Sequence, residues 1–213
     1  MKRKMRKSLG VSIGMLLAFA LWTALVCLVD VKPIGPEGSF VGFATLNGYV
    51  HGLTGVNMWL YDLTDWLGLL PIAVVFGFAI LGLVQWIGRK SILKVDRSII
   101  VLGVFYAAVF AVYLLFEIVP VNYRPVLIEG ILESSYPSST TMLVMCVMPT
   151  AIMQLRSRIK GKTAKTCVTA ALIAFTAFVV IGRLMSGVHW ASDIIGGALI
   201  SASLVSAYCA FCD

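Results

Sequence analysis

GRLMSGVHWASDIIGG, residues 182–197, lies between two long apolar runs near the C-terminal end of the chain. Charged side chains are costly inside a membrane, and those found there usually serve a function. A helix that begins within this stretch places His189 and Asp193 one turn apart on the same face. The carboxylate would then fix the tautomer of the imidazole and favour its protonated form, while Arg183 offers a planar fork for phosphate oxygens. The stretch therefore predicts an anion site at a membrane surface.

Composition restricts the kind of protein that carries this stretch. The chain has 213 residues, of which 60% are hydrophobic and only 13% are charged. This composition excludes an ordinary soluble domain, and the length suits one membrane domain, residues 1–213, with about six spans of ~20 residues each. The formal net charge is +7, but the cations occur in bursts between apolar runs without interleaved aromatic residues. A nucleic-acid-binding protein is therefore not expected.

Six apolar segments are expected to cross the membrane, and they form an all-α bundle of six transmembrane helices. Their ranges are 9–29, 66–88, 98–118, 139–156, 166–183 and 191–211. Residues 55–66, in the first outer loop, are amphipathic and carry Trp59, Tyr61 and Trp66. Because aromatic residues favour the membrane–water interface, this stretch is expected to form a helix lying in the plane of the interface.

The distribution of cations predicts the orientation of the bundle. All but three of the 17 lysines and arginines precede the first span, or lie between spans two and three or between spans four and five. Since cations accumulate on the cytoplasmic side, both termini are expected to be cytoplasmic. The exceptions are Lys32, Arg124 and Arg183. The last two belong to the predicted site, which would face the periplasm or the exterior of a multi-pass protein of the cell membrane.

The five cysteines fall inside or at the ends of apolar runs, at positions 27, 146, 167, 209 and 212. None has the clustered Cys/His spacing of a metal site, so we interpret them as small residues of the membrane core. Palmitoylation of Cys209 and Cys212 is the less favoured alternative.

Two further segments on the outer side carry groups suited to phosphate. Arg124 follows a span and precedes Pro125, whose ring restrains the turn that presents the arginine. Ser138 stands where the fourth span is expected to begin, so its hydroxyl can cap that helix and leave backbone N–H groups for phosphate oxygens. Three separate segments thus converge on one face. The alternatives are plain helix capping for Ser138, arginines that extend toward the interface, and a purely structural histidine–carboxylate pair.

In their order, these segments resemble the type 2 phosphatidic acid phosphatase superfamily of integral membrane lipid phosphatases, whose pattern is K-x6-R-P, P-S-G-H and S-R-x5-H-x3-D. The resemblance implies a six-helix bundle with the site at its outer surface. It also implies that His189 attacks phosphorus to form a phosphohistidine and that Asp193 orients it, without metal or cofactor. The phosphoryl oxygens would be held by Arg124, Ser138, Ser139 and Arg183.

The sequence departs from this pattern at four positions. Glu117 replaces the lysine, Ser139 the glycine, Thr140 the second-motif histidine, and Gly182 the first serine of the third motif. The resemblance implies that the second-motif histidine protonates the leaving group. Threonine cannot do so near neutral pH, which would cost roughly 10²–10⁴ in rate for a poor alkoxide leaving group. A lipid diphosphate is therefore favoured as substrate, because its leaving group needs less protonation.

Three residues are candidates to replace the missing acid. They are His51, which lies in the first outer loop, and the carboxylic acids Glu117 and Glu133, if burial raises their pKa. For His51 a polar residue at the interface is the favoured interpretation.

The sequence predicts a lipid phosphatase that acts at the outer membrane face through a phosphohistidine intermediate. Candidate substrates are polyprenyl diphosphate, phosphatidate and phosphatidylglycerophosphate. The expected partners are the lipid phosphate and the bilayer, and no oligomeric state is predicted. The alternatives are a lipid phosphotransferase with the same site and a non-catalytic protein that binds lipid phosphate.

Overall fold

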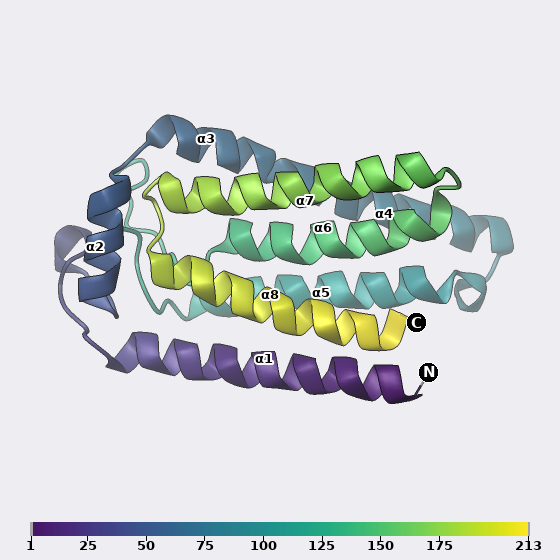
Figure 1. Cartoon of the computed structure of the whole chain (residues 1–213), viewed down its shortest axis with the longest axis horizontal. Coiled ribbons are helices and arrows are strands. Elements are labelled where there is room, and N and C mark those ends of the chain that lie inside the picture. The colour runs from purple at the N-terminus through teal and green to yellow at the C-terminus, as the bar shows by residue number, and fades with distance from the viewer. Residues whose placement is uncertain (1, 213) are drawn as a thin grey trace.

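The computed structural model describes residues 2–212, and this part of the chain forms eight α-helices. They are α1 (Lys2–Leu28), α2 (Ala44–Thr54), α3 (Met58–Leu67), α4 (Leu69–Arg89), α5 (Arg97–Ile118), α6 (Ser139–Arg158), α7 (Lys162–Met185) and α8 (Ala191–Cys212). Two 3₁₀ turns, Pro36–Gly38 and Ile92–Lys94, lie in the connections. The predicted all-α class is confirmed. The long helices lie side by side, with both ends of the chain at the same end of the bundle (Figure 1).

Each predicted span falls on one long helix: α1, α4, α5, α6, α7 and α8 in chain order. Within residues 2–212, five helical stretches are long and apolar enough to cross a membrane, and α6 is not among them. The reason is its polar content, which is buried inside the bundle rather than turned to lipid. Thr150 bonds the Cys146 carbonyl at 2.9 Å, and Gln154 donates to the Tyr208 hydroxyl. Internal partners of this kind satisfy polar groups that lipid cannot.

The predicted amphipathic helix is present, but it runs along the bundle rather than across its end (Figure 1). Residues 58–67 form α3, which continues across Gly68 into α4, so that Met58–Arg89 make one apolar helical stretch. The helix that lies across the end of the bundle is α2 instead (Figure 1). The cause is the packing of α3 on α7, where a Cβ atom on Gly182 would lie only 2.6 Å from the Thr64 methyl. Glycine at this position lets the two backbones approach closely.

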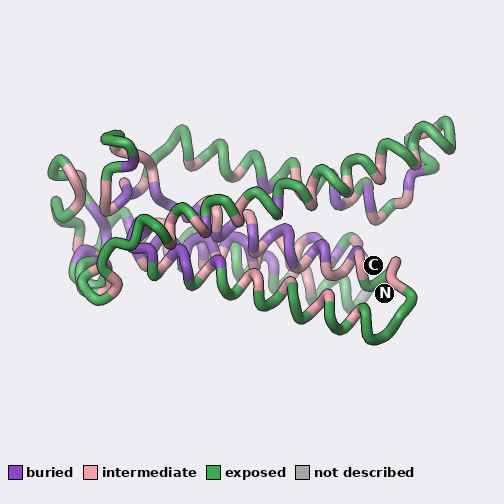
Figure 2. The backbone as a smooth tube through the Cα atoms, turned by 90° about the horizontal axis from the view of Figure 1, so that it is seen from above, coloured by how far each residue is buried: buried purple, intermediate pink, exposed green. Residues whose placement is uncertain are grey.

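Burial is concentrated along the inner faces of the bundle, and the outer helix faces are largely exposed (Figure 2). A buried apolar cluster joins α1, α5, α6 and α8, with Phe19, Phe105, Met142 and Tyr208 among its members. Two polar contacts tie α1 to α8. The Trp22 indole donates to the Ser192 carbonyl at 3.1 Å, and Ser203 donates to the Ser12 carbonyl at 2.9 Å. The exposed apolar side chains suit a lipid environment.

The two ends of the bundle differ in charge. The α4–α5 and α6–α7 connections, which carry the internal bursts of cations, lie at the same end as both termini (Figure 1). The α7–α8 connection, within residues 182–197, lies at the opposite end beside α2. The fold therefore separates the cation-rich segments from the predicted site by the length of the helices.

Candidate active site

His189 and Asp193 lie where α7 gives way to α8. Helix α7 ends at Met185 and α8 begins at Ala191, so His189 precedes the helix and Asp193 lies in its first turn. The Asp193 carboxylate accepts the Trp190 backbone N–H at 3.0 Å and so caps α8. Its Oδ2 atom lies 3.8 Å from Nδ1 of His189, and both side chains are buried. The predicted neighbours are brought together, although their separation is longer than a hydrogen bond.

The tight turn before His189 depends on a glycine. Gly187 has φ +67°, a left-handed backbone conformation that residues other than glycine rarely adopt. A Cβ atom there would also overlap the carbonyl oxygen of Gly55, just after α2. His51 of α2 reaches the same turn, and its Nε2 atom lies 3.1 Å from the Gly187 carbonyl oxygen. The first outer loop thus packs directly against the turn that presents His189.

Arg124 approaches His189 from the connection between α5 and α6. Its Nη1 atom lies 3.5 Å from Nε2 of His189, and its Nε atom lies 2.9 Å from the Glu133 carboxylate. The Trp190 indole donates to the Tyr123 carbonyl at 2.7 Å and so joins the two connections. Two segments that lie 65 residues apart are thereby brought together.

The charge state of His189 differs from the sequence-based expectation. Burial lowers the pKa of His189 well below 6.5, and the nearby cations Arg124 and Arg183 lower it further. The imidazole is therefore neutral at pH 7. Because Nε2 faces an arginine donor and Nδ1 faces Asp193, the neutral form with its proton on Nδ1 fits both neighbours. That form has a lone pair on Nε2, which can act as a nucleophile once Arg124 donates to another acceptor.

Asp193 is held by residues that the motif spacing did not indicate. Asn122 donates to its Oδ1 atom at 3.2 Å, and the Ser192 hydroxyl lies 3.3 Å from the same oxygen. Asn47 of α2 accepts the Ser192 backbone N–H at 3.1 Å. All of these side chains are buried. Asn122 precedes Arg124 by two residues. Its polarity within an otherwise apolar segment is the only feature of the sequence that could have identified it as part of the site.

Arg183 is the most deeply buried cation of the site, with a relative exposure of 1%. Its Nη1 atom lies 3.5 Å from the carboxylate of Asp65, and its guanidinium carbon lies 4.8 Å from the centre of the Tyr61 ring. The guanidinium carbon of Arg124 lies 5.8 Å from the same ring. Asp65 was not identified from the sequence, and Tyr61 was assigned to the interface. Both belong to α3.

Ser138 caps α6, as its place in the sequence predicted. Its hydroxyl accepts the Thr141 backbone N–H at 3.4 Å, and its own N–H donates to the Asp193 carbonyl at 3.1 Å. These bonds join the second motif to the third. They also occupy the Ser138 amide, so its predicted contact with phosphate depends on the hydroxyl.

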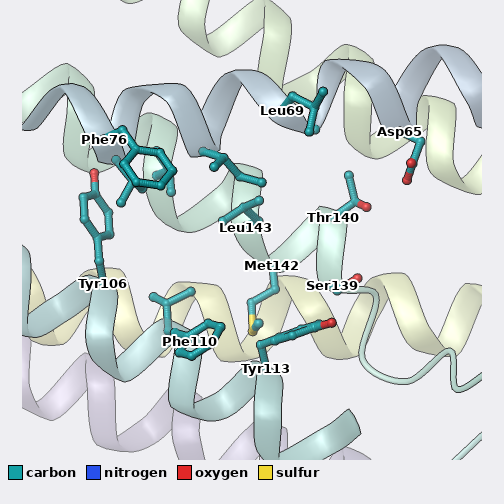
Figure 3. A pocket seen from close by; sticks show the side chains of 15 residues that line it. Asp65, Leu69, Phe76, Tyr106, Phe110, Tyr113, Ser139, Thr140, Met142 and Leu143 are labelled. Atoms are coloured by element: carbon teal, nitrogen blue, oxygen red, sulfur yellow. The ribbon is translucent and has the colours of Figure 1, made fainter. Parts of the chain in front are cut away.

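A polar cavity of about 210 Å³ lies beside the His189 ring, and an apolar cavity of about 580 Å³ lies among α4, α5 and α6 (Figure 3). The polar cavity is lined by His189, Arg124, Glu117, Glu133, Ser135 and Ser139, among others. Ser139 and Tyr113 line both cavities, which therefore adjoin. Asp65 and Thr140 lie at the same end of the apolar cavity as Ser139 (Figure 3).

The three candidate acids take different positions. Glu117 and Glu133 line the polar cavity, where Ser134 donates to Glu117 at 3.4 Å. His51 lines neither cavity; its ring lies 5.4 Å from that of Trp190, centre to centre. Thr140 lines only the apolar cavity. The carboxylic acids are thus better placed than His51 to exchange a proton beside His189.

Comparison with known proteins agrees with the motifs. The family model of the PAP2 superfamily matches residues 39–211. A search of curated proteins found no match. A crystal structure of a transmembrane PAP2-type phosphatidylglycerolphosphate phosphatase from Bacillus subtilis has a similar fold, with a TM-score of 0.60 and 19% sequence identity over 91% of this chain and 92% of that one. The match of the family model over most of the chain shows that this multi-pass membrane protein belongs to the PAP2 superfamily.

Proposed function

We propose that the chain is a membrane lipid phosphatase that works through a phosphohistidine. The observation that carries the proposal is the position of the buried His189 imidazole, whose Nε2 atom lies 3.5 Å from Arg124 beside a polar cavity. Nε2 attacks phosphorus, a P–N bond forms, and the bond from phosphorus to the leaving oxygen breaks. Water then attacks the phosphohistidine, the P–N bond breaks, and inorganic phosphate leaves.

The charged neighbours have separate tasks in this mechanism. Arg124 and Arg183 stabilise the negative charge on the phosphoryl oxygens, which is the main catalytic requirement of phosphoryl transfer. The Asp193 carboxylate faces the Nδ1–H of His189, which keeps its proton, and stabilises the imidazole as it becomes positively charged during attack. Ser138 and Ser139, at the start of α6, contribute hydroxyl groups. No metal ion or cofactor is required by these steps.

The lack of a general acid at Thr140 favours a lipid diphosphate as the substrate. Thr140 occupies the position of the motif histidine and lies in the apolar cavity, where it provides no acid. A phosphate leaving group departs with less help from a proton donor than an alkoxide does. The adjoining apolar cavity, about 580 Å³, suits the hydrocarbon chain beside the leaving oxygen. A polyprenyl diphosphate is therefore the first candidate substrate, ahead of phosphatidate and phosphatidylglycerophosphate.

The membrane topology is part of the proposal. We propose that α6 crosses the bilayer inside the bundle with the five more apolar stretches, with both termini in the cytoplasm and the site facing outward. The support is the separation of the cation-rich segments from the site, together with the preference of cations for the cytoplasmic side.

The direct test is phosphate release by the purified protein from matched lipid monophosphates and diphosphates. We expect release from the diphosphate, loss of this activity in His189→Ala, and retention in His51→Gln, which changes the other histidine. Trapping a phosphorylated His189 would support the proposed intermediate. Activity unchanged in His189→Ala would exclude that intermediate.

The replacements at Glu117 and Thr140 favour one alternative, a protein that binds lipid phosphate without turnover. Binding of lipid diphosphate without phosphate release or a trapped phosphohistidine would support it. Transfer of phosphate to an added lipid or sugar alcohol instead of water would identify a phosphotransferase with the same site.

A further inference from the structure

We propose that Tyr61 of α3 is a positioning residue of the phosphate site and that its ring face holds Arg124 and Arg183 in their converging orientation. The inference rests on the proposed function, because it assigns both arginines to phosphate. It adds a residue that lies outside the three motifs.

The distances place one aromatic ring beside two cations. The guanidinium carbon of Arg183 lies 4.8 Å from the centre of the Tyr61 ring, and that of Arg124 lies 5.8 Å from it. Both separations fall within about 6 Å, where the negative face of an aromatic ring attracts a cation. This attraction is stronger when the cation is desolvated, and both arginines are buried.

The two arginines need such a neighbour because like charges repel. Each also has a carboxylate at its side: Glu133 lies 2.9 Å from Arg124, and Asp65 lies 3.5 Å from Arg183. These carboxylates are far more exposed than the arginines, so water weakens both ion pairs. The ring carries no charge that would compete with phosphate. It therefore restrains the guanidinium groups without repelling the anion that they are proposed to bind.

The position of α3 is itself fixed by contacts with the motif segments. Asn57 caps α3 by accepting the Leu60 N–H at 3.0 Å, and the Asn57 N–H donates to the Ser186 carbonyl at 2.9 Å. One turn beyond Tyr61, the buried Thr64 packs against Gly182. The glycine that departs from the motif serine is thus the contact that brings α3, and with it Tyr61, to the arginines.

The test compares two substitutions at one position. Tyr61→Leu removes the ring, whereas Tyr61→Phe keeps it and removes only the hydroxyl. We expect Tyr61→Leu to weaken the binding of inorganic phosphate, measured by calorimetry on purified protein, by roughly 3- to 30-fold. Tyr61→Phe should remain within about twofold of the wild type. Tyr49→Leu, which changes an exposed tyrosine on α2, is the matched control and should have no effect.

A second variant separates the ring from the ion pair. Asp65→Asn removes the charge beside Arg183 with little change in shape, and we expect a smaller effect than that of Tyr61→Leu because the carboxylate is 58% exposed. In steady-state kinetics, Tyr61→Leu should raise KM and lower kcat while thermal stability stays close to that of Tyr49→Leu.

Several results would overturn the proposal. Equal losses of phosphate affinity in Tyr61→Phe and Tyr61→Leu would assign the effect to the hydroxyl. Wild-type binding in Tyr61→Leu, or a larger loss in Asp65→Asn, would show that the ring does not hold the arginines. Phosphate binding that depends on the Tyr61 ring without lipid hydrolysis would refute only the proposed function. A wild type that neither binds inorganic phosphate nor releases it from lipid would refute both.

Discussion

Nη1 of Arg124 lies 3.5 Å from Nε2 of His189, the ring nitrogen that does not face Asp193. An arginine is a donor only, so this contact requires an unprotonated Nε2. The same cation that is proposed to bind phosphate therefore keeps the histidine in its nucleophilic form. In the proposed mechanism, bound phosphate partly neutralises the arginine as positive charge develops on the imidazole.

The pKa of His189 should lie below 6.5. Since burial and two nearby cations disfavour the protonated form, the folded protein takes up this proton only at a lower pH than a model peptide would. We expect NMR titration of histidine-labelled protein to show a neutral His189 at pH 6.5, with His51→Gln used to assign the two resonances. A titration midpoint above 7 would contradict this prediction.

The pH dependence of activity should reflect this low pKa of His189. The neutral imidazole is the reactive form, so kcat/KM should not fall on account of His189 between pH 8 and 6.5, and the acidic limb should lie below that range. Arg124→Gln removes one of the cations that disfavour protonation. In that variant the NMR midpoint of His189 should move upward, whatever the change in rate.

Asn122→Ala should lower kcat more than it raises KM. Its amide donates to Oδ1 of the buried Asp193, as the Ser192 hydroxyl also does, and loss of a bond to a buried charged group costs about 1–3 kcal/mol. This corresponds to a fall of roughly 5- to 150-fold in rate if the whole loss appears in the transition state. Gln85→Ala is the comparison variant, because its amide also donates to a carboxylate, that of Asp96, but at the opposite end of the bundle. An effect of Asn122→Ala on KM alone would exclude a role through Asp193.

Gly182→Ala should destabilise the protein although alanine is the better helix former. The new methyl group would lie 2.6 Å from the Thr64 methyl, and overpacking of this kind costs about 1–3 kcal/mol. Thermal unfolding in detergent measures the loss. Gly77→Ala, in α4, meets no neighbouring atom within 4 Å and should be neutral or slightly stabilising. The double variant with Thr64→Ser, which removes the opposing methyl, should recover most of the stability.

Thr140→His restores the motif acid and should broaden the substrate range. The new imidazole would lie beside the leaving group, so hydrolysis of a lipid monophosphate should increase by up to ~10²-fold, whereas that of a diphosphate should change little. Thr140→Asn is the control, because it places a polar side chain without an acid at the same position. Thr141→His would not serve, because Thr141 is buried. An equal increase for both substrates would argue against the proposed preference.

The orientation can be measured with single cysteines. After replacement of the five native cysteines, one cysteine is placed at Glu129, between α5 and α6, or at Gly161, between α6 and α7; both positions are exposed. An impermeant thiol reagent should label Glu129→Cys in intact cells and Gly161→Cys only after the membrane is opened. The reverse pattern would place the site in the cytoplasm.

Local patterns in the sequence were sufficient for the class of fold and for the central pair of the site. Continuous apolar runs identify helices whatever their neighbours are, and His189 and Asp193 lie close because they are four residues apart. The hydroxyl of Ser138 was predictable as a cap for the same local reason. The path of residues 55–67 was not, because whether an amphipathic helix lies at the interface or packs on another helix depends on the partner that it meets.

What tertiary structure alone decided is the environment of those local features. Tyr61, Asp65 and Asn122 reach the site from separate segments, and no sequence spacing relates them to residues 182–197. The neutral state of His189 likewise arises from burial and from an arginine 65 residues away. Which groups are available follows from the order of the amino acids, since helix periodicity and hydrophobicity act over a few residues. Their charge states and partners were decided by folding, because desolvation and electrostatic contact depend on distance in space.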